Sequence, residues 1–317
     1  MEIIRNIEKT RMMLKCAATI GVFDGVHAGH QQVIRRLVSD ARFHHLASMV
    51  ITFDRQPRQL FDPHFRPQLL TTQEEKEQEL ERLGIDILVV LPFTEEIASL
   101  SAREFMSQIL KERLNVKLLQ IGYDNRFGHD RTEGFEDYVR YGHELGIIVY
   151  QGIKMSFQGY DMDVCSSNIR SLLSEDGDVE TAAVLLERPY QLSGKVMPGE
   201  HIGHQLGFPT ANLQPDDPFK LIPASGAYAV LATIGDRQEP QPAMMNIGTR
   251  PTFDGRNRTL EVNIFDFEGD LYGQTVLITF VSRLREERKF ESPEALIQQL
   301  KEDREKVIKM IREIGGN

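Results

Sequence analysis

Short apolar runs alternate with helical patterns through the first half of the chain, between residue 17 and about residue 151. Five of these runs have the length and continuity of strands: residues 17–22, 48–53, 85–91, 116–121 and 147–150. The segments between them carry apolar residues at helical spacing, for example Val33, Ile34, Leu37, Val38 and Ala41. Strands that alternate with helices predict an α/β fold with a doubly wound parallel sheet, whose ligands bind at the carboxyl ends of the strands.

Capping residues mark where several of these helices begin and end. Thr72 and Glu75 have the spacing of a capping box, and Gly84 is placed to end the helix that they open. Gly146 is placed to end a second helix, over residues 135–145. The sequence therefore predicts the bounds of these helices as well as their presence.

Glycine and proline become frequent after residue 191, and short strand-like runs recur there: residues 191–196, 227–234, 243–247, 259–265 and 274–280. This spacing predicts a small antiparallel β-barrel. A terminal helix follows, with Ser292 as N-cap and Pro293 at its first position. We expect its apolar stripe to pack on the barrel: Leu296, Leu300, Val307 and Ile311. The change of pattern places a domain boundary near Glu187, which gives domains of residues 1–185 and 186–317.

Length and charge narrow the class of protein. A chain of 317 residues suits two domains, each with its own core. A net charge of −10 gives the chain no general attraction for nucleic acid or acidic membranes, so local donors would have to hold an anionic substrate. Cys16 and Cys165 have neither metal-site nor paired spacing, and we see no signal peptide or membrane span. We expect a cytoplasmic protein, either a monomer or a weak homo-oligomer.

The sequence Gly-Val-Phe-Asp-Gly-Val-His-Ala-Gly-His, at residues 21–30, joins the first strand to the first helix. A glycine-rich turn at a helix N-terminus offers free backbone N–H groups to an anion. His27 and His30 are three residues apart, so their rings can face the same nucleotide phosphate. The segment is neither a P-loop nor a Gly-x-Gly-x-x-Gly dinucleotide fingerprint. The alternative is a pair of exposed histidines in a turn.

Two further strand ends carry polar loops, at residues 122–128 and 165–170. Ser166, Ser167 and Arg170 could grip phosphate oxygens at the N-terminus of a short helix. Alternatively, one serine only caps the helix and Arg170 is solvated.

The segment Gly-Phe-Pro-Thr-Ala-Asn, at residues 207–212, is the corresponding feature of the second half. In an extended chain Thr210 and Asn212 share one face, and their oxygens are ligands suited to Mg²⁺. On spacing alone, a turn held by Thr and Asn hydrogen bonds is the competing explanation.

Residues 21–30 resemble the phosphate-binding signature of the nucleotidyltransferase superfamily, in the form found in bacterial bifunctional riboflavin kinase/FAD synthetases. Both strand-end loops also match that family, with Asn125 where an aromatic residue is common and with Cys165 and Ser167 in place of Ser and Thr. The resemblance implies a Rossmann-like nucleotidyltransferase domain in which His27 and His30 are catalytic. It also implies a larger set that binds ATP and its phosphates: Gly21, Phe23, Asp24, Gly25, Gly29, Asp124, Ser166, Ser167 and Arg170.

Residues 207–212 resemble the riboflavin kinase signature, and several flanking motifs agree with it. The resemblance implies that Thr210 and Asn212 hold the metal and that Glu261 is the base. The alternative for Glu261 is a glutamate on an outward strand face. His204 stands where Arg is usual, and Asn263 where His is common. The implied ATP- and flavin-binding residues of the kinase are Gly207, Phe208, Pro209, Asn246, Arg250 and Arg285.

These resemblances together predict an enzyme that phosphorylates riboflavin with ATP and Mg²⁺ to give FMN, and then transfers AMP from ATP to FMN to give FAD. Two alternatives stay open. One is a nucleotidyltransferase that acts on another phosphorylated acceptor, such as a pantetheine or nicotinate derivative. The other is an inactive flavin-binding sensor that keeps the fold.

Overall fold

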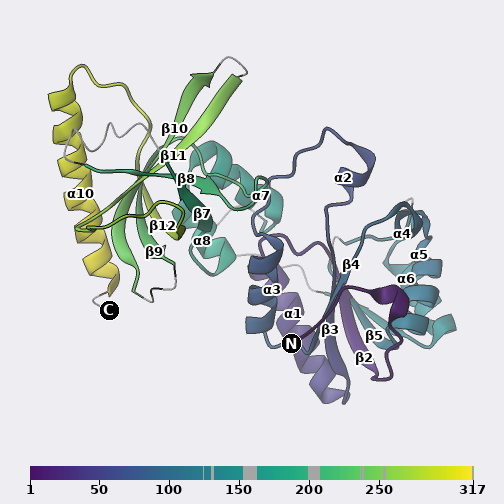
Figure 1. Ribbon diagram of the computed structural model, residues 1–317. Coiled ribbons are helices and arrows are strands. Elements are labelled where there is room, and N and C mark those ends of the chain that lie inside the picture. The colour runs from purple at the N-terminus through teal and green to yellow at the C-terminus, as the bar shows by residue number, and fades with distance from the viewer. Residues whose placement is uncertain are drawn as a thin grey trace. The chain divides into compact units, whose positions relative to one another are not determined.

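The computed structural model describes residues 1–123, 125–129, 132–152, 163–198, 208–235, 237, 239–252 and 255–315. The backbone divides into two compact units, Met1–Ser166 and Ser167–Asn317. Figure 1 shows a layered α/β unit that carries the N-terminus and a β-barrel unit that carries the C-terminus.

Six parallel strands form the sheet of the first unit: β1 (Glu2–Ile4), β2 (Cys16–Ile20), β3 (Ala47–Phe53), β4 (Ile87–Leu91), β5 (Val116–Ile121) and β6 (Ile148–Gln151). Their order across the sheet is β1-β4-β3-β2-β5-β6. The predicted doubly wound sheet and its five strands are therefore confirmed. The sequence analysis missed β1, because a three-residue strand with one buried side chain leaves no readable pattern.

Helices cover both faces of this sheet (Figure 1). On one face, α1 (Ala28–Phe43) and α3 (Gln73–Arg82) pack on alternate strand residues such as Ala17 and Val50. On the other, η2 (Phe105–Arg113) and α6 (Phe135–Leu145) pack on their neighbours, such as Ala18 and Met49. A strand buried on both faces reads as a continuous apolar run, which is why these strands were visible in the sequence. Shorter helices complete the unit: η1 (Ile7–Lys9), α2 (Arg58–Phe61), α4 (Glu95–Ser99) and α5 (Ala102–Glu104).

The predicted helix ends are also confirmed. Thr72 and Glu75 form the capping box of α3, with each side chain accepting from the other residue's backbone N–H. Gly84 and Gly146 follow α3 and α6 with φ of +76° and +73°. Glycine adopts this left-handed conformation without steric cost, so both helices end there.

The second unit is a closed antiparallel barrel of six strands: β7 (Gln191–Met197), β8 (Ala211–Pro215), β9 (Gly226–Ile234), β10 (Gln241–Thr252), β11 (Gly255–Ile264) and β12 (Thr275–Arg285). The predicted barrel is confirmed, and β8 begins within the segment expected to be extended, at Ala211, directly after Thr210. Helix α10 (Pro293–Gly315) begins at Ser292, whose Oγ accepts from the Ala295 N–H at 3.2 Å. Its buried Val307 packs with Phe208, Met244 and Phe265, flanked by Leu300 and Ile311 of the predicted stripe.

Three short helices precede the barrel: α7 (Ser166–Ser171), η3 (Leu172–Asp176) and α8 (Val179–Leu186). Hydrogen bonds attach η3 to the barrel unit, including Ala224 N–H to Leu173 O at 2.8 Å and Arg283 Nη1 to Asp176 O at 2.6 Å. We expected a boundary near Glu187, where the sequence pattern changes. The backbone contacts group residues 167–186 with the barrel, and the boundary near Glu187 stays a prediction.

Candidate active sites

The turn after β2 and the loop after β5 meet at the point where the sheet reverses its winding. Strand β2 pairs with β3 on one side and with β5 on the other, and the connections diverge from there. The side-chain Nδ2 of Asn125, in the loop after β5, donates to the carbonyl of Ile20 at the end of β2. In open α/β sheets this crevice outside the carboxyl ends is where ligands bind.

The turn at residues 21–26 has an unusual backbone. Phe23, Gly25 and Val26 have positive φ angles of +51°, +84° and +40°. Phenylalanine and valine occupy this region at a cost of about 1–3 kcal/mol each, and such conformations cluster at functional sites. Surrounding contacts must therefore hold the turn in this shape.

Asp24 supplies many of these contacts. Its side chain is 3% exposed, and its Oδ1 accepts from the backbone N–H groups of Leu70 and Thr71 at 2.9 and 3.1 Å. The Gly25 N–H donates to Thr71 Oγ1 at 3.0 Å, and Ser166 Oγ donates to the Asp24 carbonyl at 2.9 Å. The predicted site residues Asp24, Gly25 and Ser166 thus lie together, and the Asp24 side chain accepts from backbone N–H groups of the protein itself.

The two histidines of the sequence motif are stacked at the start of α1. His27 is the N-cap, and its Nδ1 accepts from the His30 backbone N–H at 3.3 Å. The ring centroids are 3.6 Å apart with an interplanar angle of 19°, and His30 meets the Phe23 ring edge-on at 5.2 Å. A Cβ on Gly29 would lie 3.3 Å from the His27 ring, so glycine leaves room for this stack. Both rings lie where the helix N-terminus attracts anions.

The surroundings of His30 disfavour its protonation. Burial, and then the neighbouring His27 and Lys76, lower the pKa of His30 well below its ordinary value of 6.5. Its Nδ1 is buried and has no hydrogen-bond partner among the residues that the structure describes. A buried nitrogen without a partner is costly in the resting protein, which is typical of a site that a ligand completes.

The remaining residues predicted for this site are only partly placed. Gly21 follows β2 directly, and its N–H donates to the Ile51 carbonyl at 3.0 Å. Ser167 and Arg170 lie on α7, in the second unit. Asp124 lies outside the described residues.

Three polar residues predicted for the kinase site form one row across the barrel wall. Glu261 on β11 is registered opposite Asn246 on β10 and opposite Asn212 on β8. Side chains opposite one another across antiparallel strands share a face, with Cβ atoms about 5 Å apart. All three are half-buried. Thr210, also half-buried, lies two residues before Asn212. The predicted base and metal ligand are therefore neighbours.

Asn263 connects this row to the segment before β8. Its side chain is 7% exposed, and its Nδ2 donates to the Pro209 carbonyl at 2.7 Å. Phe208, the residue before Pro209, is buried in the cluster beneath α10. Asn263 lies two positions after Glu261 on β11, so their side chains share a face. The hydrogen bond fixes the backbone next to Thr210.

Arg285 makes contacts that join β12 to α10. Its Nε donates to Asp303 Oδ2 at 2.8 Å, and the guanidinium lies 5.5 Å from the centre of the Phe290 ring. Asp303 is only 1% exposed, so this ion pair is shielded from water. The other two predicted kinase residues are not placed, because Gly207 and the side chain of Arg250 lie outside the described residues.

The donors near Asn212 fit Mg²⁺ better than a tightly chelated metal. The described part of the chain has no group of three or more His, Cys, Asp or Glu side chains that could hold a metal. Magnesium keeps several waters and phosphate oxygens and takes few protein ligands, so one hydroxyl and one amide oxygen suit it.

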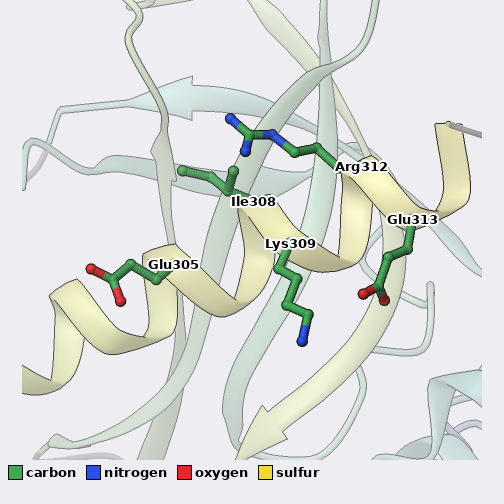
Figure 2. A pocket seen from close by; sticks show the side chains of 5 residues that line it. All are labelled: Glu305, Ile308, Lys309, Arg312 and Glu313. Atoms are coloured by element: carbon green, nitrogen blue, oxygen red, sulfur yellow. The ribbon is translucent and has the colours of Figure 1, made fainter.

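A cavity of about 420 Å³ lies along α10 and is lined by Glu305, Ile308, Lys309, Arg312 and Glu313 (Figure 2). All five side chains come from this one helix. None of them is among the residues predicted for either site, so the cavity offers no support for the proposed chemistry.

Family models match both halves of the chain, that for FAD synthetase at residues 9–168 and that for riboflavin kinase at residues 186–311. A bifunctional riboflavin kinase/FMN adenylyltransferase from Escherichia coli K12 is 34% identical over 96% of both chains. The enzyme of that name from Pseudomonas fluorescens is 36% identical over 93% of both. The chain belongs to the bifunctional riboflavin kinase/FMN adenylyltransferase family. The resemblance noted in the sequence is thus confirmed.

This chain also resembles a solved structure from Streptococcus pneumoniae, which is described as a macrolide-efflux protein. It is 32% identical, has a TM-score of 0.85, and covers 96% of this chain and 98% of that one. None of the helices described here is both long enough and apolar enough to cross a membrane.

Several residues that shape the two sites of this family member were not found from the sequence. In the turn after β2, Gly25 is bonded to Thr71 and Val22 to Thr52, which in turn accepts from Lys76. Asn263 was noted only as a departure from the family pattern. Lys76 had a detectable signal, because it lies four residues before Leu80 on the buried face of α3. A lysine at such a position is rarely buried without a partner.

Proposed function

We propose that this protein makes FMN and FAD in two steps at two separate sites. Residues 186–317 phosphorylate riboflavin with ATP, and residues 1–185 transfer AMP from ATP to the resulting FMN. The proposal depends on one observation, that the two units carry different groups of polar side chains. One unit has stacked histidines at a helix N-terminus, and the other has a half-buried carboxylate beside an amide oxygen suited to Mg²⁺.

The kinase step needs a base. The riboflavin 5′-hydroxyl barely ionises at neutral pH, so a carboxylate that takes its proton assists attack on the γ-phosphorus of ATP. Glu261 accepts that proton, the new O–P bond forms, and ADP leaves. Thr210 and Asn212 hold Mg²⁺, which supplies charge neutralisation for the transferred phosphoryl group. Phe208, Pro209, Asn246 and Arg285 line the binding site for ATP and flavin, with Gly207 and Arg250.

The adenylyl step needs charge stabilisation instead. The FMN phosphate has a second pKa of about 6 and is already an anionic nucleophile at pH 7. It attacks the α-phosphorus of ATP, and pyrophosphate leaves. His27, His30 and the N-terminus of α1 stabilise the charge that develops on the phosphate oxygens. The turn around Asp24 and Gly25 shapes the phosphate site, to which Ser166, Ser167, Arg170 and Asp124 contribute.

The decisive experiment gives the purified protein riboflavin, ATP and Mg²⁺ and separates the flavins by chromatography. Glu261→Gln should lower FMN formation by about a hundredfold to ten-thousandfold, the usual value of a general base, while FAD formation from supplied FMN continues. His30→Ala should lower FAD formation by about a hundredfold or more, so that FMN accumulates. Glu268→Gln, at an exposed glutamate of the same half, is the matched control and should change neither step.

Three outcomes would contradict the proposal. Loss of both steps by either substitution in a folded protein would contradict the separation of the sites. Adenylylation of a pantetheine or nicotinate derivative in preference to FMN would identify another acceptor. Flavin binding without any turnover would identify a sensor. We further propose that the protein acts in the cytoplasm as a monomer or weak homo-oligomer, without nucleic acid or membrane partners.

A further inference from the structure

Lys76 is a buried cation on a helix whose other charged residues are exposed or half-buried. Its side chain is only 7% exposed, although it lies among the glutamates of α3. Together with Leu80, four residues later, it faces the sheet. Burying an ammonium group in this position costs free energy that an apolar residue would not. The lysine must therefore interact with something specific on that side of the helix.

The contacts of Lys76 lead to the turn that carries the stacked histidines. Its Nζ donates to Thr52 Oγ1 at 3.5 Å, and Thr52 Oγ1 donates to the Val22 carbonyl at 3.1 Å. Thr52, on β3, is fully buried. One hydroxyl thus links the ammonium to the first residues of the turn. The N-terminal end of α3 also holds this turn through Thr71, which is bonded to Asp24 and Gly25.

We propose that Lys76 is a positioning residue for adenylyl transfer: its buried ammonium, held on Thr52, braces the turn at residues 22–25 so that His27 and His30 meet the nucleotide phosphates. This inference rests on the function proposed above. The strained backbone at Phe23 and Val26 explains why a brace is needed, since a turn at positive φ persists only when its surroundings over-determine it.

The charge of Lys76 supports a role beyond packing. Burial lowers the pKa of Lys76, whereas the carboxylates of Asp24 and Glu77 act in the opposite direction. The ammonium also helps to lower the pKa of His30. Among the described residues, the titratable groups that act on His30 are His27, the N-cap of α1, and Lys76 on α3, and both disfavour its protonation. A fixed positive charge behind an anion site makes the electrostatic potential of that site more positive. It therefore stabilises a bound phosphate without any rearrangement during the reaction.

The test uses three variants of the full chain. Lys76→Met removes the charge and keeps a flexible side chain of similar length, Lys76→Arg keeps the charge, and Lys111→Met changes an exposed lysine of the same unit. We expect Lys76→Met to lower kcat for FAD formation from FMN by about tenfold, the effect of losing one positioning interaction. Riboflavin phosphorylation by the same preparation should not change. Lys76→Arg should recover part of the rate, and Lys111→Met should match the wild type.

Two measurements separate positioning from simple stability. The pKa of His30, followed by NMR in the free protein, should rise in Lys76→Met, because a neighbouring positive charge is removed, and should stay low in Lys76→Arg. Thr52→Val should slow FAD formation as well, and the double variant should be no slower than the slower single variant, because both act through one link.

Wild-type kinetics in Lys76→Met would overturn the role of Lys76, as would an equal loss of kinase and adenylyltransferase activity. An unchanged pKa of His30 in Lys76→Met would do the same. Failure of the wild-type protein to make FAD from FMN would instead overturn the proposed function, and it would be recognised before any variant is compared.

Discussion

Replacing Asp24 by alanine tests whether this carboxylate shapes the turn after β2 or binds the nucleotide directly. The substitution removes the acceptor of two buried backbone N–H groups, those of Leu70 and Thr71. Both residues are at most 3% exposed, so water cannot replace the lost oxygen without disturbing the packing. A buried donor left without a partner costs about 1–3 kcal/mol, and two such donors give a local destabilisation of about 2–6 kcal/mol.

Hydrogen exchange followed by mass spectrometry measures this effect where it arises. A chain of two units does not have one well-defined unfolding free energy, so a local probe is preferable to a global melt. Peptides that contain Leu70 and Thr71 should exchange at least about thirtyfold faster in Asp24→Ala, which corresponds to the lower bound of 2 kcal/mol. Asp24→Asn keeps one oxygen acceptor and should lose much less protection. If exchange is unchanged in Asp24→Ala and only the apparent affinity for ATP falls, the residue acts on the nucleotide and our argument is wrong.

Three further predictions concern other contacts of the two units. Asn263→Ala removes the hydrogen bond to the Pro209 carbonyl and should lower kinase kcat by about tenfold in a steady-state assay, while FAD formation from FMN stays unchanged. Gly128→Ala should lower the melting temperature, because φ is +98° and the new Cβ would lie 2.7 Å from the Ala102 backbone nitrogen; Gly134→Ala, where nothing lies within 4 Å, is its control. The lowered pKa of His30 predicts that this residue leaves the free energy of unfolding unchanged above about pH 6.5. Below that pH the free energy of unfolding should fall, by at most about 1.4 kcal/mol per pH unit. Melting curves of His30→Gln should show less of this acid sensitivity than those of the wild type.

The fold was largely predictable because its signals are local. Continuous apolar runs predicted β2 to β6, and the strand-like run at residues 259–265 predicted most of β11. Glycines at positive φ gave the ends of α3 and α6. The strand β1 was missed because its three residues have almost no pattern of their own, and it exists through pairing with β4.

Only those parts of the sites whose residues lie close together in the sequence could be predicted. His27 and His30 share one helix start, so their meeting could be foreseen. The contacts that hold them could not, because Asp24 is 46 residues from Leu70 and Asn263 is 54 residues from Pro209. Periodicity reports which side of an element is buried, not which distant partner it meets. The same limit hid Lys76, whose burial was readable from its position but whose connection to Val22 was not.

The two units treat their carboxylates in opposite ways, and this difference agrees with the proposed division of the chemistry. In the barrel, Glu261 stays half-buried beside Asn212 and Asn246, where a substrate hydroxyl could reach it. In the α/β unit, the carboxylate of Asp24 is within the nucleotide-binding turn but accepts two backbone N–H groups and faces the charge of Lys76. A carboxylate left bare in that turn would repel both the nucleotide and the FMN phosphate. On the proposed function, the fold therefore uses the carboxylate of Asp24 as a structural acceptor where the reaction needs positive potential, and it keeps Glu261 to accept a proton where the nucleophile is a neutral alcohol.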